Sequence, residues 1–183
     1  MLSETKGDFD TALYYLRLRA DGGDTYSMRK SAMFILNGMG KPEDPSVAVE
    51  YLKRASAKGD TRSQVRLADC YQRGLGIEQN YDEMINWLTI ASQDGDPEAQ
   101  AKLGYCYKNG MGVIRNTDIA ARWFLQSAKA GYAPAQVAMG DCYMQGSGVP
   151  CDISTAVEYY RQAAEQGDSL GEASLAFAYY DGK

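Results

Sequence analysis

Three of the four cysteines recur at a fixed interval, and a thiol is the first group in this sequence that could act as a nucleophile. Cys70, Cys106 and Cys142 lie 36 residues apart, and each is followed by a tyrosine. A cysteine nucleophile needs a neighbouring base, usually histidine, and the sequence contains no histidine. We therefore interpret the periodic thiols as small buried hydrophobic groups.

The other residue types that support catalysis are also poorly placed. The absence of histidine removes the commonest general base and metal ligand. Carboxylates occur as helix caps or scattered on polar faces, such as Glu158 and Glu165, without forming a pair. The glycine pairs at 74/76 and 110/112 lack the preceding strand, the third glycine and the GK[ST] sequence of phosphate loops, and they are interpreted as turns. The sequence predicts no enzyme activity, no metal site and no cofactor.

The same spacing bears on the redox state of the thiols. Equivalent positions in stacked helical units lie about 8 to 10 Å or more apart, whereas a disulfide needs Cα atoms within about 7 Å. We expect the three periodic cysteines to be reduced, with a bond between Cys142 and Cys151 as the alternative. Reduced thiols favour the cytoplasm or another reducing compartment, unless a signal lies outside the given sequence.

Composition narrows the class of partner. The chain has 183 residues, 45% of them hydrophobic, and a net charge of −5, which is typical of a soluble globular protein. An acidic chain lacks the basic face that phosphate backbones require, so nucleic acid is not expected as a partner. No apolar run approaches the roughly 18 residues of a membrane span, and the start, MLSETKGDFD, has no signal core. Membrane insertion is not expected.

The elements that position these residues repeat every 36 residues. A glycine closes each copy, and a fixed period of this size indicates stacked supersecondary units rather than one globular core. The boundaries predict a single repeat domain over 1–183, made of a half-repeat at 8–23, full repeats at 24–59, 60–95, 96–131 and 132–167, and a half-repeat at 168–183.

Local patterns divide each copy into two helices, about ten in all. Aspartates follow most closing glycines at the phase of a helix N-cap, and a second series of Asp and Asn caps recurs within the repeats. The first series is Asp24, Asp60, Asp96 and Asp168, broken by Tyr132, and the second is Asp44, Asn80, Asn116 and Asp152. Small residues such as Gly104 and Gly140 should let the helices of a pair approach, and Trp123 is predicted to be core.

These features together resemble the Sel-one-like repeat, a relative of the tetratricopeptide repeat. The resemblance rests on AQAKLGYCYKNGMGV with AARWFLQSAKAG in one copy, and on AQVAMGDCYMQGSGV with AVEYYRQAAEQG in the next. Residues 24–59 depart from the pattern at Ser31, Ile35 and Lys41. The resemblance implies an all-α fold, an α-solenoid of antiparallel helix pairs that forms a right-handed superhelix, with the first helices lining a concave groove.

The resemblance also implies the kind of function. Members of this family typically act as non-catalytic adaptors that assemble protein complexes. Some secreted relatives carry a disulfide in every repeat and have a hydrolase-like activity, but this chain lacks their paired cysteines, having Ala91 and Ser127 in that region. The alternatives left open are a structural spacer within a larger repeat protein and, through the two half-repeats, end-to-end self-association.

The groove positions follow by analogy with the related repeat. An aromatic, methionine and arginine mixture there is typical of interface cores, and the basic N-terminal part predicts a protein or peptide partner that is acidic at that end. Solvated surface is the alternative for the same residues. The predicted partner-binding residues are Arg29, Met33, Arg62, Asp69, Arg73, Tyr105, Lys108, Asn109, Asp141, Met144, Phe177 and Tyr180.

Overall fold

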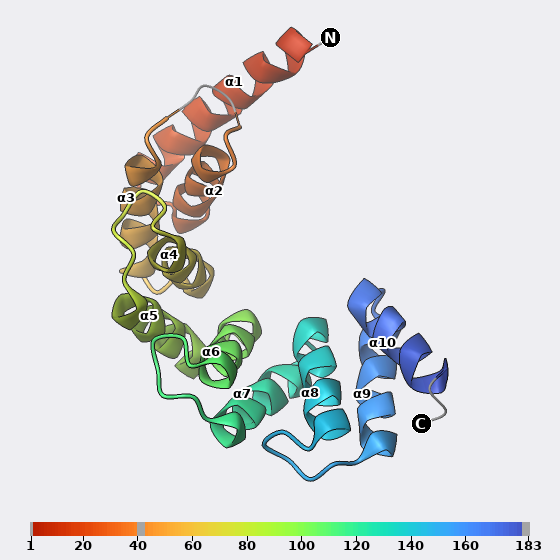
Figure 1. Ribbon diagram of the computed structural model, residues 1–183. Coiled ribbons are helices and arrows are strands. Elements are labelled where there is room, and N and C mark those ends of the chain that lie inside the picture. Colours follow the sequence, from red (N-terminus) through yellow and green to blue (C-terminus); the bar gives the residue numbers. More distant parts are fainter. Residues whose placement is uncertain (1, 40–42, 181–183) are drawn as a thin grey trace. The chain divides into compact units, whose positions relative to one another are not determined.

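The computed structural model describes residues 2–39 and 43–180, and all regular structure within them is α-helical, as predicted (Figure 1). No helix among these residues has the length and apolar character needed to cross a membrane. The helices follow one another in sequential pairs. They are α1 (Leu2–Asp21), α2 (Thr25–Leu36), α3 (Pro45–Ser56), α4 (Thr61–Arg73), α5 (Tyr81–Gln93), α6 (Pro97–Asn109), α7 (Thr117–Lys129), α8 (Ala133–Gln145), α9 (Ile153–Glu165) and α10 (Ser169–Tyr180).

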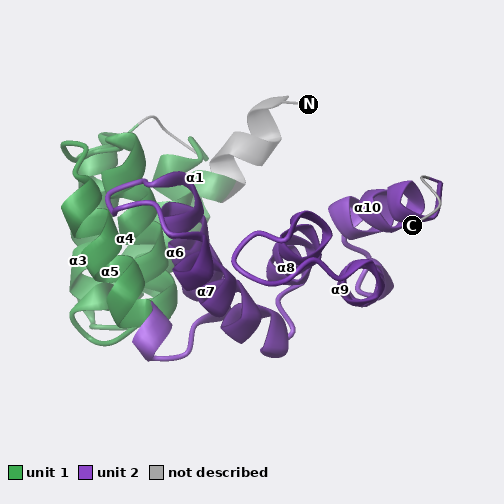
Figure 2. Cartoon of the chain, turned by 60° about the horizontal axis from the view of Figure 1, so that its bottom comes forward, with its two compact units in different colours: residues 1–91 green, residues 92–183 purple. Residues whose placement is uncertain are grey.

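The chain divides into two compact units, unit 1 at residues 1–91 and unit 2 at residues 92–183 (Figure 2). Unit 1 holds α1 to α4 and most of α5, and unit 2 holds α6 to α10. Consecutive helices pack together from α1 to α4 in unit 1 and from α6 to α10 in unit 2, where α8 also contacts α10. The sequential pairs therefore stack as in a solenoid. We call α2, α4, α6, α8 and α10 the first helices of their repeats, and α3, α5, α7 and α9 the second helices.

The N-terminal helix differs from the prediction. The predicted half-repeat starts at residue 8, whereas α1 begins at Leu2. Residues 2–7 contain one glycine and no proline, so nothing in their sequence forces a helix to start at Asp8.

Side-chain caps fix the starts of seven helices. In each case a carboxylate or amide oxygen accepts a hydrogen bond from a backbone N–H two or three residues later, which satisfies one of the unpaired amides of the first turn. The pairs are Asp24 with Ser27, Asp44 with Ser46, Asn80 with Glu83, Asp96 with Ala99, Asn116 with Ile119, Asp152 with Thr155 and Asp168 with Gly171.

Asp60 is the exception among the predicted caps. Its carboxylate makes no bond to a backbone amide of α4. It accepts instead from the hydroxyl of Ser63 and, at 3.0 Å, from Nε of Arg29 on α2. Asp60 therefore connects two neighbouring first helices of unit 1 in addition to starting one of them.

Glycines bring the helices of a pair together in unit 2. A Cβ added at Gly104 would lie 2.6 Å from the ring of Phe124, and one added at Gly140 would collide with the ring of Tyr160. Phe124 is fully buried and Tyr160 nearly so. Trp123, predicted to be core, is only partly buried, because it lies one residue before Phe124 and points about 100° away around the helix.

A second glycine contact joins successive repeats within each unit. Gly148, at φ +74°, lies so close to the carbonyl of Thr117 at the start of α7 that no Cβ can be accommodated. Gly76, at φ +67°, lies in the same way against Pro45 at the start of α3. The GxG turns are thus confirmed as turns, and their second glycine sets how closely one repeat stacks on the preceding one.

All four cysteines are unbonded, as expected for the periodic three. Cys70, Cys106 and Cys142 are buried, and Cys151 is exposed. Burial raises the pKa of the Cys70 and Cys106 thiols to about 11 and also raises that of Cys142. Buried thiols of this kind are structural rather than nucleophilic.

We expect iodoacetamide to alkylate Cys151 alone in the native protein at pH 8. A thiol with a pKa near 11 is ionised to about one part in a thousand at that pH, and burial also blocks access to it. Peptide mass spectrometry before and after urea denaturation checks this, with the three buried thiols reacting only in urea. Native modification of Cys70 at the rate of Cys151 would contradict the assignment.

Candidate partner-binding surface

Unit 2 contains a cleft between consecutive first helices. It has a volume of about 460 Å³ and lies between α8 and α10, with α9 beneath. We call it the unit 2 cleft. Its lining residues are Asp141, Met144 and Gln145 of α8, Tyr160 of α9, and Ala173, Ser174, Phe177 and Ala178 of α10.

Among the residues that the structure describes, Asp141 is the one charged residue that lines the unit 2 cleft. The hydroxyl of Tyr160 donates a hydrogen bond to Asp141 Oδ1 at 2.9 Å. Burial raises the pKa of Tyr160, and the bond to the Asp141 carboxylate raises it further, so the tyrosine stays protonated and remains a donor. The carboxylate is thereby held in place in the lining of the cleft.

Apolar side chains form the walls of the unit 2 cleft. Met144 is partly buried, while Phe177 is 67% exposed and presents its ring to solvent. Tyr105 of α6 lies close enough to Asp141 for the carboxylate to contribute to the raised pKa of its phenol, after the larger effect of burial. Tyr105 packs edge-on against the buried Phe124, with ring centroids 4.8 Å apart. The surface beside the cleft is therefore supported by the core of unit 2.

A second cleft, of about 480 Å³, lies in unit 1 between α2 and α4. We call it the unit 1 cleft. Its charged lining residues within the described part of the chain are all basic, and the other described lining residues are apolar or carry an amide. The lining residues are Arg29, Lys30, Met33, Phe34, Asn37, Met39 and Arg66.

Aromatic and acidic groups hold the cations of the unit 1 cleft in place. Arg29 pairs with Asp60, and both Arg29 and Lys30 lie over the ring of Tyr26, at 5.5 and 5.6 Å from its centroid. Arg66 pairs with Asp69 on its own helix, with Nη1 donating to Oδ2 at 3.0 Å. These contacts restrict the positions of the three cationic side chains.

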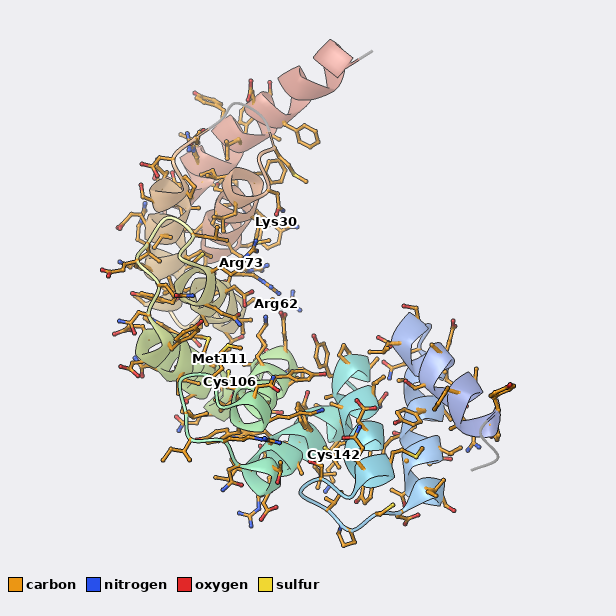
Figure 3. All side chains as sticks on the ribbon, viewed as in Figure 1. Lys30, Arg62, Arg73, Cys106, Met111 and Cys142 are labelled. Carbon is orange, nitrogen blue, oxygen red and sulfur yellow. The ribbon has the colours of Figure 1, made fainter. Side chains whose placement is uncertain are left out.

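Two further arginines extend the basic surface. Arg62 and Arg73, at opposite ends of α4, are both exposed. Figure 3 shows that Lys30, Arg62 and Arg73 project from α2 and α4 on the side of unit 1 away from α3. No ion pair involves Arg62 or Arg73 within the described residues.

The structure brings five predicted residues into clefts and leaves others on open surface. Arg29 and Met33 line the unit 1 cleft, and Asp141, Met144 and Phe177 line the unit 2 cleft. The other seven predicted residues lie on first helices but outside both clefts. Tyr180, which is 90% exposed, and Asn109 both lie in solvent. Lys108 is partly buried, and Asp69 pairs with Arg66. The remaining three are Arg62 and Arg73 on the basic surface of unit 1, and Tyr105 beside the unit 2 cleft.

Several lining residues were missed by the groove analogy. Lys30, Phe34 and Arg66 lie one position after the predicted phases, and Tyr160 lies on a second helix, outside the predicted positions. Tyr160 is buried, but its hydroxyl reaches the cleft. A tyrosine where other repeats place phenylalanine or leucine was the available signal, since a buried hydroxyl requires a polar partner.

Comparison with known proteins supports the repeat assignment along the chain. A family model described as the Sel1 repeat matches residues 3–24, 25–60, 61–96, 97–132 and 133–168. Each of the later matches starts one residue after the boundary drawn from the closing glycines. No curated protein matches the sequence.

Solved structures with the same helical arrangement include three from bacteria. A Sel1 repeat protein from Oxalobacter formigenes has a TM-score of 0.86 and 24% identity, covering 93% of this chain and 68% of its own. The protein c5321, a protective antigen present in uropathogenic Escherichia coli strains displaying an SLR fold, has a TM-score of 0.85 and 31% identity over 93% of this chain. This chain spans 36% of the length of c5321.

The third structure is more distant. The immunity protein Pa5087 from Pseudomonas aeruginosa has a TM-score of 0.64 and 19% identity, covering 87% of this chain and 59% of its own, which shows a likeness of fold alone. The family model covers most of the sequence, and the identity to c5321 extends over nearly all of it. The chain belongs to the Sel1 repeat family.

Proposed function

We propose that this chain is a non-catalytic protein-binding scaffold that takes segments of a partner protein on the first helices of each unit. The proposal rests on one observation, which is that residues at equivalent repeat positions line a cleft in both units. Met33 corresponds to Asp141 and Phe177, and Asn37 corresponds to Gln145. The scaffold thus presents clefts at fixed positions, while the side chains that line them differ.

The chemistry of the clefts favours protein segments as ligands. Each combines apolar walls with a few charged or amide groups, and both volumes lie within the range of about 300 to 1,000 Å³ typical of ligand sites. No group of His, Cys, Asp or Glu side chains in the described residues is arranged to hold a metal ion. Structures of the same fold include proteins named as an immunity protein and as a protective antigen, and neither name describes an enzyme.

The basic surface of unit 1 sets the character of the segment bound there. Arg62 and Arg73 are exposed without an ion pair in the described structure, and the unit 1 cleft adds Lys30. Arginine donates two parallel hydrogen bonds to a carboxylate, which makes it suited to acidic side chains. The proposed ligand of unit 1 is an acidic stretch of the partner.

Reversing both arginines, Arg62→Glu with Arg73→Glu, should reduce partner capture about tenfold or more at low salt, because like charges then face each other across the interface. A crosslinking pull-down with the full chain as bait measures this, followed by quantitative mass spectrometry. The matched control is Arg122→Glu with Lys129→Glu, which reverses two exposed charges on the second helix α7. Equal capture by both double variants would reject the assignment.

A further inference from the structure

We propose that the unit 2 cleft binds a basic side chain of the partner, with arginine preferred over lysine. The inference rests on the proposed function and specifies the ligand chemistry of one of its sites. Unit 1 would then bind acidic side chains and unit 2 a basic one, so the two clefts would select different parts of a partner.

The first support is a fixed carboxylate. Tyr160 is 4% exposed, and its hydroxyl donates to Asp141 Oδ1. The ring of Tyr160 occupies the space that the missing side chain of Gly140 leaves open, so the donor cannot easily move. The other oxygen of Asp141 has no hydrogen bond in the described structure, and it remains available to a donor from the ligand.

The second support is the absence of a neutralising cation within the described residues. No lysine or arginine there forms an ion pair with Asp141, and none lines the unit 2 cleft. Lys108 of α6 lies near enough to lower the pKa of Cys142 slightly against the larger effect of burial, without pairing with Asp141. A carboxylate in a cleft whose other described lining residues are uncharged attracts a positively charged group.

The third support is the shape and apolar character of the walls. Met144, Ala173 and Ala178 offer surface for the methylene groups of a long basic side chain. The ring of Phe177, 67% exposed, can stack on a planar guanidinium, which favours arginine over lysine. The volume of about 460 Å³ is ample for one such side chain.

The unit 1 cleft gives an internal contrast. At the repeat positions of Ala173 and Ser174, unit 1 carries Arg29 and Lys30, so a basic ligand side chain would meet like charges there. The same repeat positions therefore repel a basic ligand side chain in unit 1 and accommodate it in unit 2.

Methionine NMR provides a direct test on the full chain. In protein labelled with [methyl-¹³C]methionine, N-acetyl-arginine N-methylamide should shift the Met144 methyl signal saturably at low salt, with the signal assigned by Met144→Leu. The methyl of Met139, which is fully buried, should stay unchanged, as should that of Met33 in unit 1. The neutral isostere N-acetyl-citrulline N-methylamide should leave Met144 unshifted.

Two variants test the residues that carry the inference. Asp141→Asn keeps an oxygen for the Tyr160 hydroxyl and should weaken binding of the arginine derivative at least about fivefold. Phe177→Ala, at an exposed position that leaves folding intact, should weaken it about two- to threefold. The matched control Asp118→Asn removes one exposed charge from α7 and should leave binding unchanged.

Equal binding of the arginine and citrulline derivatives would overturn the inference, and so would equal binding by the wild type and Asp141→Asn. If the inference fails while the Arg62/Arg73 reversal still abolishes partner capture, the scaffold function stands and only the ligand of unit 2 is wrong. If the Met144 signal responds as expected but the arginine reversal leaves capture unchanged, the unit 1 assignment fails instead.

Discussion

Replacing Phe124 with alanine is expected to lower the free energy of unfolding by about 3 to 5 kcal/mol, the range for a large buried aromatic side chain. Phe124 is fully buried against Gly104, and it also supports Tyr105 through their edge-on contact. Because the backbone at Gly104 offers no side chain to fill the space, the variant keeps most of the cavity. Urea denaturation followed by circular dichroism measures the loss.

The neighbouring residue provides the control. Trp123→Ala removes a larger side chain that is only partly buried, and it should cost about 1 to 2 kcal/mol. If the Trp123 variant is as unstable as the Phe124 variant, the tryptophan contributes more to the free energy of unfolding than its partial burial indicates.

Gly148→Ala should destabilise the protein by roughly 2 to 5 kcal/mol through two separate effects. The residue has a positive φ of +74°, which a side chain disfavours, and its Cβ would collide with the backbone carbonyl of Thr117. A backbone atom at the start of α7 cannot move aside without shifting the helix.

Gly131→Ala separates these two effects. Gly131 has a similar φ of +84°, but a Cβ there meets nothing within 4 Å. Its substitution should cost only the conformational term of about 1 to 2 kcal/mol. The difference between the two midpoints of urea denaturation then reports the close approach of successive repeats, and equal costs would contradict that contact.

The fold was largely predictable because the same helix-pair pattern recurs several times along the sequence. The 36-residue period, the closing glycines and the cap series each located the helices independently, and seven caps are formed as expected. Asp60 shows the limit of such reasoning. Its position in the series is regular, but an arginine on a different helix takes one of its oxygens, and only the tertiary structure brings Arg29 there.

The prediction that Trp123 belongs to the core was wrong, and comparison of the repeats explains why. Tryptophan recurs at 87 and 123, but the deeply buried position in every full repeat is the next one. Its occupants are Leu52, Leu88, Phe124 and Tyr160, all at most 4% exposed. The size of this residue depends on the residue 20 positions earlier, on the first helix of the same repeat. Where that residue is alanine, at 32 and 68, the buried residue is leucine, and where it is glycine, at 104 and 140, the buried residue is aromatic.

The candidate site was predictable only in part. The repeat analogy named Arg29, Met33, Asp141, Met144 and Phe177, and these residues line the two clefts because each phase on a first helix is fixed by the core. It could not show which of the predicted positions lie beside a hollow, since that depends on how neighbouring first helices diverge. Tyr180 satisfies the sequence rule as well as Phe177 does, yet it stands in solvent outside the cleft.

The exchange of glycine for alanine in the core has a consequence for how such a protein can acquire new ligands. Asp69 and Asp141 occupy the same repeat position, but Asp69 has Leu88 at the corresponding core site and pairs with Arg66, whereas Asp141 is held by the Tyr160 hydroxyl. Two differences between the copies thus decide the partner of the same carboxylate: Arg66 is replaced by Ala138 on the first helix, and Leu88 is replaced by Tyr160 in the core. Copies of one duplicated repeat can therefore diverge in recognition through their core residues as well as through their surface.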